Sequence, residues 1–339
     1  MKAAVWYGGE DIKIEDVPKP RIESTEVLVR VRSVGICGSD LHAFEGISKR
    51  RKPPLIMGHE FSGEVEEVGR DTTGLGIGDI VVVDPVIRCG KCEQCARGRG
   101  NICRNLTLLG LHKNGAFAEY VPVPANNCHR LSEGVSFEEG SMVEPLAVAV
   151  HAVNRTTIKL GDRVAIIGAG IIGLTVLLAA KAAGAGNVSV VDILDYRLEF
   201  AKNFGADLAI NSKTEDMEKR VKEVTDGNGA DVVLEAVGLE ATVRDAMRVL
   251  GRGGRLTILG NLEQTMRLDV MDAVVKEFDI KGSYCYDIDD FKRALNLIED
   301  GRVDVKTLIT NVLPLNEAKT GFKLLHEKLG KVLKVLLKP

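Results

Sequence analysis

The chain has 339 residues, of which 45% are hydrophobic and 27% are charged, and its formal net charge is -3. These values are typical of a folded globular protein of about two domains, and they exclude a disordered or fibrous chain. The nearest approach to a dense basic run is KRRK at residues 49–52, so nucleic-acid binding is not expected.

The sequence predicts neither export nor a membrane span. The N-terminal residues become acidic before any apolar run reaches the length of a signal-peptide core. The longest apolar stretch, AIIGAGIIGLTVLLAAKAAGA, carries early glycines and Lys181, which fits a buried strand and helix better than a membrane span. We therefore expect a cytoplasmic protein whose cysteines stay reduced, and there clustered cysteines are more often metal ligands or catalysts than disulfides.

Residues 1–145 are predicted to be β-rich, because short alternating segments such as EVLVRVRSVGI and DIVVVDPV are separated by Gly, Pro and Asp. Residues that can bind a metal or a proton lie in three short motifs, GICGSDLH, GHEF and MVEP. They are Cys37, Ser39, Asp40, His42, His59, Glu60 and Glu144. A thiolate, an imidazole and a carboxylate suit a catalytic zinc ion with room for water or substrate. A lone Cys or His is more often structural, so these residues alone leave both interpretations open.

Four cysteines within residues 88–104 follow the spacing C-x2-C-x2-C-x7-C: Cys89, Cys92, Cys95 and Cys103. Short C-x2-C turns bring sulfurs to one side of a tetrahedral zinc ion, and the longer loop closes the cage. Iron–sulfur clusters favour other spacings, and a reducing compartment disfavours disulfides. We predict a closed structural zinc site that does no chemistry.

From about residue 161 the pattern changes to alternating strands and helices, as in RVAIIGA, IGLTVLLAAKAAG and NVSVVDI. This alternation predicts an α/β domain with a doubly wound parallel sheet. After about residue 283 two further helices and a final strand, KVLKVLLK, are expected to return to the β-rich part. The simplest architecture is a doubly wound domain inserted into a discontinuous β-rich domain.

A G-x-G-x-x-G turn follows the first strand of the α/β part and opens an apolar helix, and it predicts a dinucleotide site. The cofactor-binding candidates are the turn, an acid at the end of the next strand and an arginine soon after: Gly168, Gly170, Ile171, Ile172, Gly173, Asp192 and Arg197. The carboxylate of Asp192 would accept hydrogen bonds from the ribose hydroxyls and repel a 2′-phosphate, so NAD is preferred to NADP. The alternative is that the glycines only serve a strand-to-helix turn.

Taken together, these motifs resemble the zinc-dependent medium-chain dehydrogenase/reductase family, which includes zinc alcohol, polyol and threonine dehydrogenases. Six motifs occur in family order over essentially the whole chain: GICGSDLH, GHEFSGEVEEVG, CGKCEQC, NGAFAEYV, GAGIIG and GKVLKVLL. The resemblance implies a GroES-like catalytic domain of residues 1–145 and 284–339, interrupted by a Rossmann domain of residues 146–283. It also implies two zinc ions per chain, NAD as cofactor and a homo-oligomer, with a tetramer favoured.

The resemblance implies these candidate ligands around the catalytic zinc: Cys37, His59, Glu60 and Glu144. Glu60, expected to be the labile one, is either a ligand or an acid just beyond the ligands, and Glu144 contacts zinc directly or through water. It places Ser39 beside the substrate oxygen and passes the proton through the nicotinamide ribose toward His42. Asp40 would orient His59, or alternatively cap a helix.

EPLAVAVHA is similar to the polyol dehydrogenase branch, which implies oxidation of a secondary alcohol in a polyol, sugar acid or sugar phosphate. GSYCYD places Cys285 where sorbitol dehydrogenases usually have an arginine between two aromatic residues, and this departure puts sorbitol itself in doubt. A threonine or simple-alcohol dehydrogenase, and a non-catalytic protein that binds zinc and a dinucleotide, remain the alternatives.

Overall fold

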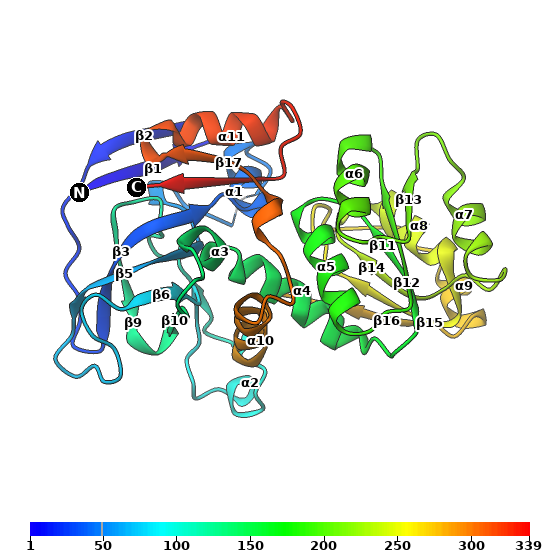
Figure 1. The fold of residues 1–339 in the computed structure, drawn as a ribbon, viewed down its shortest axis with the longest axis horizontal. Helices are drawn as coiled ribbons and strands as arrows, with labels where there is room; N and C mark the ends of the chain where they lie inside the picture. The colour runs from blue at the N-terminus through cyan, green and yellow to red at the C-terminus, as the bar shows by residue number, and fades with distance from the viewer. Residues whose placement is uncertain (49) are drawn as a thin grey trace. The chain divides into compact units, whose positions relative to one another are not determined.

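The computed structural model of the protein describes residues 1–48 and 50–339; Lys49, the first residue of the basic run, lies outside the described residues. The chain forms two compact units, Met1–Glu144 with Asp287–Pro339, and Pro145–Tyr286. Both ends of the chain therefore build the first unit, and the second is one continuous insertion (Figure 1). The predicted insertion of an α/β domain into a β-rich domain is confirmed.

The first unit is built on a sheet in the order β10-β6-β5-β3-β18-β17, with β9 also paired to β3, and on a smaller sheet, β2-β1-β4. The C-terminal strand β18 pairs antiparallel with β3, which joins the two ends of the chain. The strands of this unit are β1 (Lys2–Gly8), β2 (Asp11–Asp16), β3 (Glu26–Gly35), β4 (Leu55–Ile56), β5 (Glu60–Val68), β6 (Ile80–Val83), β7 (Val86–Ile87), β8 (Thr107–Leu108), β9 (Tyr120–Pro124), β10 (Cys128–Arg130), β17 (Ile309–Pro314) and β18 (Lys334–Lys338).

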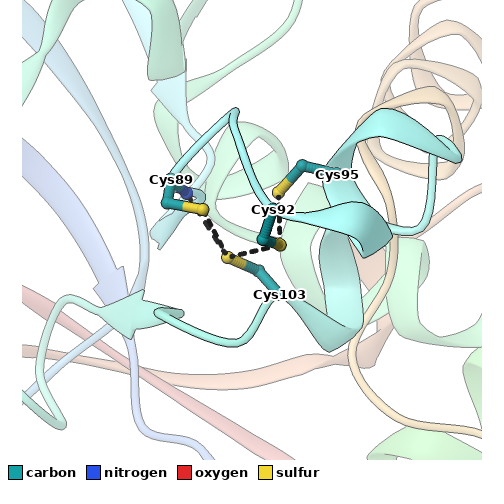
Figure 2. Close-up of side chains that lie close together, drawn as sticks. All are labelled: Cys89, Cys92, Cys95 and Cys103. Atoms are coloured by element: carbon teal, nitrogen blue, oxygen red, sulfur yellow. Dashed lines mark hydrogen bonds between the residues drawn. The ribbon is translucent and has the colours of Figure 1, made fainter.

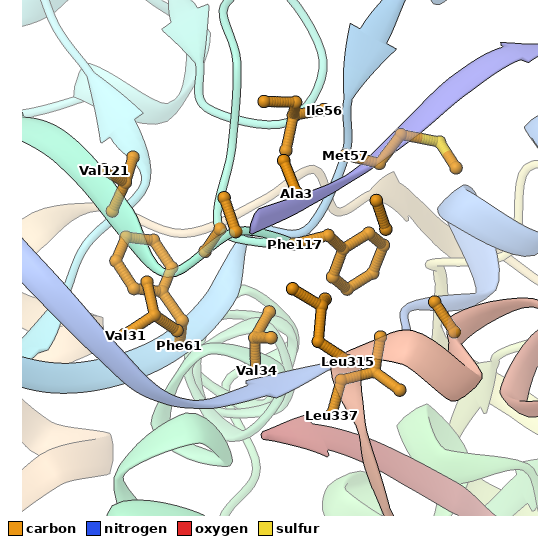
Figure 3. Packing of buried hydrophobic residues seen from close by; sticks show 14 of the residues in the cluster. Ala3, Val31, Val34, Ile56, Met57, Phe61, Phe117, Val121, Leu315 and Leu337 are labelled. Atoms are coloured by element: carbon orange, nitrogen blue, oxygen red, sulfur yellow. The ribbon is translucent and has the colours of Figure 1, made fainter. Parts of the chain in front are cut away.

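Short helices complete this unit: α1 (Gly38–Phe44), α2 (Glu93–Ala96), α3 (Phe137–Ser141), α10 (Ile288–Glu299), α11 (Ala318–His326) and the start of α4 (Val143–Thr156). One hydrophobic core holds the unit together and draws side chains from both ends of the chain, as Figure 3 shows for Ala3, Phe61, Phe117, Leu315 and Leu337. Apolar surface from distant segments is thus removed from water together, which stabilises the discontinuous domain.

The second unit contains a parallel sheet in the order β13-β12-β11-β14-β15-β16. This is the strand order of a Rossmann fold, with the switch point between β11 and β14. Its elements are β11 (Arg163–Ile167), α5 (Ile171–Ala182), β12 (Asn187–Asp192), α6 (Asp195–Asn203), β13 (Leu208–Asn211), α7 (Met217–Glu223), β14 (Ala230–Glu235), α8 (Glu240–Val249), β15 (Leu250–Ile258), α9 (Val270–Val275) and β16 (Asp279–Gly282).

The central strands of this sheet are apolar and buried, as the alternation of strands and helices predicted. Helix α9 was not predicted, because its sequence, VMDAVV, is rich in valine, which lowers helix propensity. In the structure this helix leaves four apolar side chains more than half exposed: Val270, Met271, Val274 and Val275. Across the described part of the chain, helices that combine the length and the apolar character needed to cross a lipid bilayer are absent.

Candidate active site and metal centres

The segment that follows β3 folds into the short helix α1 and fixes the first candidate ligand. Cys37 is the N-cap of this helix, and its Sγ accepts a hydrogen bond from the Ser39 backbone N–H at 3.5 Å. The Asp40 carboxylate accepts in return from the Cys37 backbone N–H at 3.1 Å. Cys37 is therefore the N-cap residue, and Asp40 at N3 completes the capping box with its Oδ2. The Asp40 side chain is fully buried, and its other oxygen, Oδ1, faces Arg51 and His59.

Strand pairing brings His59 and Glu60 to Cys37, because Glu60 at the start of β5 lies opposite Gly35 at the end of β3. One ligand atom each of Cys37, His59 and Glu60 lies within 4.8 Å of the others. His59 and Glu60 are buried, and His59 Nδ1 lies 3.6 Å from Asp40 Oδ1. A thiolate, an imidazole and a carboxylate that converge in this way fit a zinc ion.

The electrostatics of this pocket also fit a cation. Burial alone would lower the pKa of His59, but the charges of Asp40 and Cys37 outweigh burial and raise it well above its usual 6.5. Burial would raise the pKa of Asp40, yet the charges of His59 and Arg51 lower it. The acidic groups around His59 thus favour a positive charge at its position, as a cation-binding site requires.

Lys334 of β18 is a part of this pocket that sequence reasoning missed. Its ammonium group is fully buried, pairs with the Glu60 carboxylate and donates to the Ile36 carbonyl at 3.3 Å. Burial would lower the pKa of Lys334, but the charges of Glu60 and Cys37 raise it, so the side chain remains a cation. The available signal was a lysine in the middle of an apolar strand, in VLKVLL.

Glu144 lies in the first turn of α4 and is buried, but it is not among the three residues whose ligand atoms converge. Its charge nevertheless contributes to the raised pKa of Lys334. Glu144 is thus close enough to Lys334 to interact with its charge, and it lies on a different element than Cys37 and His59.

The two candidate proton-transfer residues lie on α1, next to Cys37. Ser39 is exposed, and its hydroxyl accepts a hydrogen bond from the buried Arg51 at 3.2 Å. His42 is half-buried, and burial lowers its pKa below 6.5. The imidazole is consequently neutral at pH 7 and able to accept a proton.

The four-cysteine segment forms the second candidate metal centre (Figure 2). Sγ of Cys103 lies 3.4 Å from that of Cys89 and 3.8 Å from that of Cys92, and Sγ of Cys92 lies 3.5 Å from that of Cys95. Zn–S bonds of about 2.3 Å place tetrahedral sulfurs about 3.8 Å apart, whereas disulfide sulfurs lie about 2.05 Å apart. The sulfur spacing fits a tetrahedral zinc site and not disulfides.

The glycine turn after β11 has the geometry that a dinucleotide needs. Gly168 has a φ of +97°, and a Cβ on Gly173 would collide with the Gly168 carbonyl, so neither position accepts a side chain without strain. A Cβ on Gly170 would instead meet only Arg197 Nη1, at 3.8 Å, which leaves room for a pyrophosphate. Ile171 and Ile172 begin α5.

Asp192 ends β12, where its carboxylate was predicted. Oδ2 accepts from the Ala169 backbone N–H at 2.8 Å, and Oδ1 accepts from Ile193 N at 2.7 Å. Arg197 Nη1 lies 3.6 Å from Oδ2. The acid is thus tied to the glycine turn and holds a cation beside it.

Glu235 at the end of β14 was also missed by sequence reasoning. Its buried Oε1 accepts from the backbone N–H groups of Val237 and Gly238 at 2.9 and 2.8 Å. Val237 lies against Gly168, where its Cγ2 would be 2.5 Å from an added Cβ. Glu235 therefore shapes the loop that borders the glycine turn.

Two known families match successive parts of the chain. The family described as the alcohol dehydrogenase GroES-like domain matches residues 23–133, and the family described as zinc-binding dehydrogenase matches residues 172–300. D-xylulose reductase A of Aspergillus niger is 38% identical over 98% of this chain and 95% of its own. Sorbitol dehydrogenase of Bacillus subtilis is 36% identical over 100% of this chain and 97% of its own.

A solved zinc-binding dehydrogenase from Sinorhizobium meliloti, bound to NADP, superposes with a TM-score of 0.94 at 32% identity and covers 100% of this chain and 99% of its own. The chain belongs to the zinc-binding alcohol dehydrogenase family. It is an NAD(P)-dependent oxidoreductase of the polyol and alcohol dehydrogenase branch, as the motifs predicted.

Proposed function

We propose that the protein oxidises a secondary alcohol of a polyol, sugar acid or sugar phosphate and passes the hydride to NAD. The convergence of Cys37, His59 and the buried Glu60 carboxylate beside Ser39, whose backbone N–H donates to Cys37 Sγ, carries this proposal. The D-xylulose reductase and sorbitol dehydrogenase relatives support the polyol class. Cys285 in the place of an arginine argues against sorbitol itself as the substrate.

Cys37, His59 and Glu144 would hold the catalytic zinc, and Glu60, whose ligand atom converges with those of Cys37 and His59, would be a labile partner. Glu60 is already paired with the buried ammonium of Lys334. The Cys37 thiol and the His59 imidazole would bind the metal after losing their protons to solvent. Asp40 would orient His59, since Nδ1 faces its carboxylate at 3.6 Å. A bound zinc ion acts as a Lewis acid that makes an alcohol easier to deprotonate.

The chain's own residues would move the proton. Ser39 would receive the alcohol proton on its hydroxyl oxygen while it releases its own hydrogen through the cofactor ribose toward His42. The neutral imidazole of half-buried His42 suits the role of terminal acceptor.

NAD is proposed as the cofactor, although a relative of known structure is bound to NADP. The phosphates would lie at the start of α5 beside Gly168, Gly170 and Gly173, and the Asp192 carboxylate would bind the ribose hydroxyls and repel a 2′-phosphate. Arg197 also belongs to this proposed site, because its guanidinium lies beside both Gly170 and Asp192.

The site formed by Cys89, Cys92, Cys95 and Cys103 would hold a structural zinc ion. Four sulfurs at tetrahedral spacing leave no coordination position for a substrate. The same reduced thiols support a cytoplasmic location.

A homo-oligomer, with a tetramer favoured, is proposed through the open edge of the parallel sheet. Strand β16 ends the sheet, and the neighbouring helix α9 exposes Val270, Met271, Val274 and Val275. Sedimentation of the wild type and of a Val274→Asp variant tests this: a smaller species is expected for the variant, and an unchanged species would contradict the interface.

A screen of NAD reduction tests the function. Polyols, hexonates, phosphorylated hexitols, threonine and simple alcohols are offered to the zinc-loaded protein. Turnover of a polyol, sugar acid or sugar phosphate is expected. Preferred turnover of threonine or ethanol would move the protein to another substrate class, and no turnover of any alcohol, with zinc and NAD bound, would favour a binding protein.

A further inference from the structure

Among the described residues of the basic run, 50–52, Arg51 is buried. Arg51 is 5% exposed, whereas Arg50 and Lys52 on either side are exposed. A buried guanidinium loses its hydration, so its charge and its donors must be matched inside the protein. The partners of Arg51 therefore indicate what it does.

The guanidinium donates to acceptors from three residues. Nε donates to the Gly110 carbonyl at 2.9 Å, and Nη1 donates to the Ser39 carbonyl at 2.7 Å. Nη2 donates to Asp40 Oδ1 at 2.7 Å and to Ser39 Oγ at 3.2 Å. The planar fork of an arginine can make these contacts together, whereas a lysine ammonium cannot.

Both residues that Arg51 holds on α1 belong to the proposed site. Asp40 Oδ1 faces His59 Nδ1 at 3.6 Å, so the same carboxylate oxygen serves Arg51 and the metal-ligand candidate. The Ser39 oxygen accepts from Arg51, which directs its O–H hydrogen away from the guanidinium. A fixed positive charge beside this oxygen also stabilises negative charge that develops there when the hydroxyl releases its hydrogen.

We propose that Arg51 is a positioning residue that fixes the Ser39 hydroxyl and the Asp40 carboxylate. Through Ser39 it aligns the proton transfer, and through Asp40 it orients His59. The inference rests on the proposed function. Ser39 gains the alcohol proton and loses its own, so the hydroxyl is neutral before and after the transfer, and Arg51 is unchanged.

The experiment compares zinc-loaded Arg51→Met and Arg51→Lys with the wild type, and uses Lys52→Met, the exposed neighbour, as the matched control. Three quantities are measured: kcat with the KM for NAD, the rate of zinc release to a colorimetric chelator, and the Tm. Cys37→Ser identifies which phase of zinc release belongs to this pocket.

Arg51→Met should lower kcat by ~10- to 100-fold with the KM for NAD little changed, since a misplaced relay slows transfer without weakening cofactor binding. Zinc release from the pocket should be about tenfold faster or more, because His59 loses its oriented partner. Arg51→Lys, which restores the charge but not the fork, should recover zinc retention more than kcat. Lys52→Met should behave as the wild type.

Combination with Ser39→Ala separates this inference from a general structural role. If Arg51 acts through Ser39, Arg51→Met should lower kcat by less than about threefold in the Ser39→Ala background. Independent, multiplicative losses would overturn the inference, as would unchanged kcat and zinc release in Arg51→Met. If Arg51→Met does not fold, Arg51→Lys tests the inference by whether it recovers zinc retention more than kcat. Wild-type values of both kcat and zinc retention in Arg51→Lys would refute the role of Arg51.

The failure of the proposed function gives a different result. Full activity of Ser39→Ala, or no alcohol oxidation by the wild type, removes the relay itself. Loss of activity in Ser39→Ala together with a fully active Arg51→Met removes only the role of Arg51.

Discussion

Replacement of Lys334 by Met leaves the carboxylate of Glu60 buried without its cation. Both side chains are at most 1% exposed, so water cannot replace the lost partner. Removal of one member of a buried ion pair costs about 3–5 kcal/mol, whereas an exposed pair contributes about 0–1 kcal/mol. We therefore expect Lys334→Met to lower the free energy of unfolding of the zinc-free protein by about 3 kcal/mol or more.

Urea unfolding with and without zinc measures this effect. The matched control is Lys2→Met, which breaks the exposed Lys2–Asp16 pair and should cost little. The double variant Lys334→Met/Glu60→Gln, with neither charge, should recover most of the loss, and zinc should reduce the loss by supplying a cation beside Glu60. A loss in zinc-free Lys334→Met no larger than that in Lys2→Met would refute the role assigned to the pair.

Three further results are expected. Cys92→Ser should lose the structural zinc, and tryptic cleavage within residues 88–104 should become about tenfold faster or more. The folded variant should keep nearly normal activity. Inactivity of a fully folded variant would contradict a purely structural site. Asp192→Asn should raise the ratio of kcat/KM for NADP to that for NAD by about tenfold, since a repulsive charge is removed, and an unchanged ratio would argue against the ribose contact. Burial lowers the pKa of His129 from 6.5 to about 4. The contribution of its neutral imidazole to the free energy of unfolding is therefore complete above pH 6.5 and is lost as the pH falls toward 4. Urea titrations should therefore show a loss of about 3 kcal/mol over this range that His129→Gln lacks, and parallel pH profiles would contradict it.

The sequence predicted the fold because local patterns determine it. Alternating buried strands and helices, the turn at Gly168 and the acid at Asp192 are features of neighbouring residues, and the parallel sheet follows from them. The four-cysteine centre was equally predictable, because its ligands lie within one short segment.

The partners of the catalytic pocket could not be predicted in this way. Lys334 and Glu60 are 274 positions apart, and the pairing of β3 with both β18 and β5 brings them together. Arg51 was indistinguishable from its exposed neighbours in KRRK, because burial depends on tertiary packing and not on composition. Such charged residues become recognisable only when the structure shows what they contact.

Metal analysis combined with turnover tests the central claim most directly. The wild type should contain about two zinc ions per chain, and Cys37→Ser should contain about one and lose alcohol oxidation while NAD still binds. About one zinc ion in a fully active wild type, or full activity in Cys37→Ser, would contradict a catalytic zinc at this pocket.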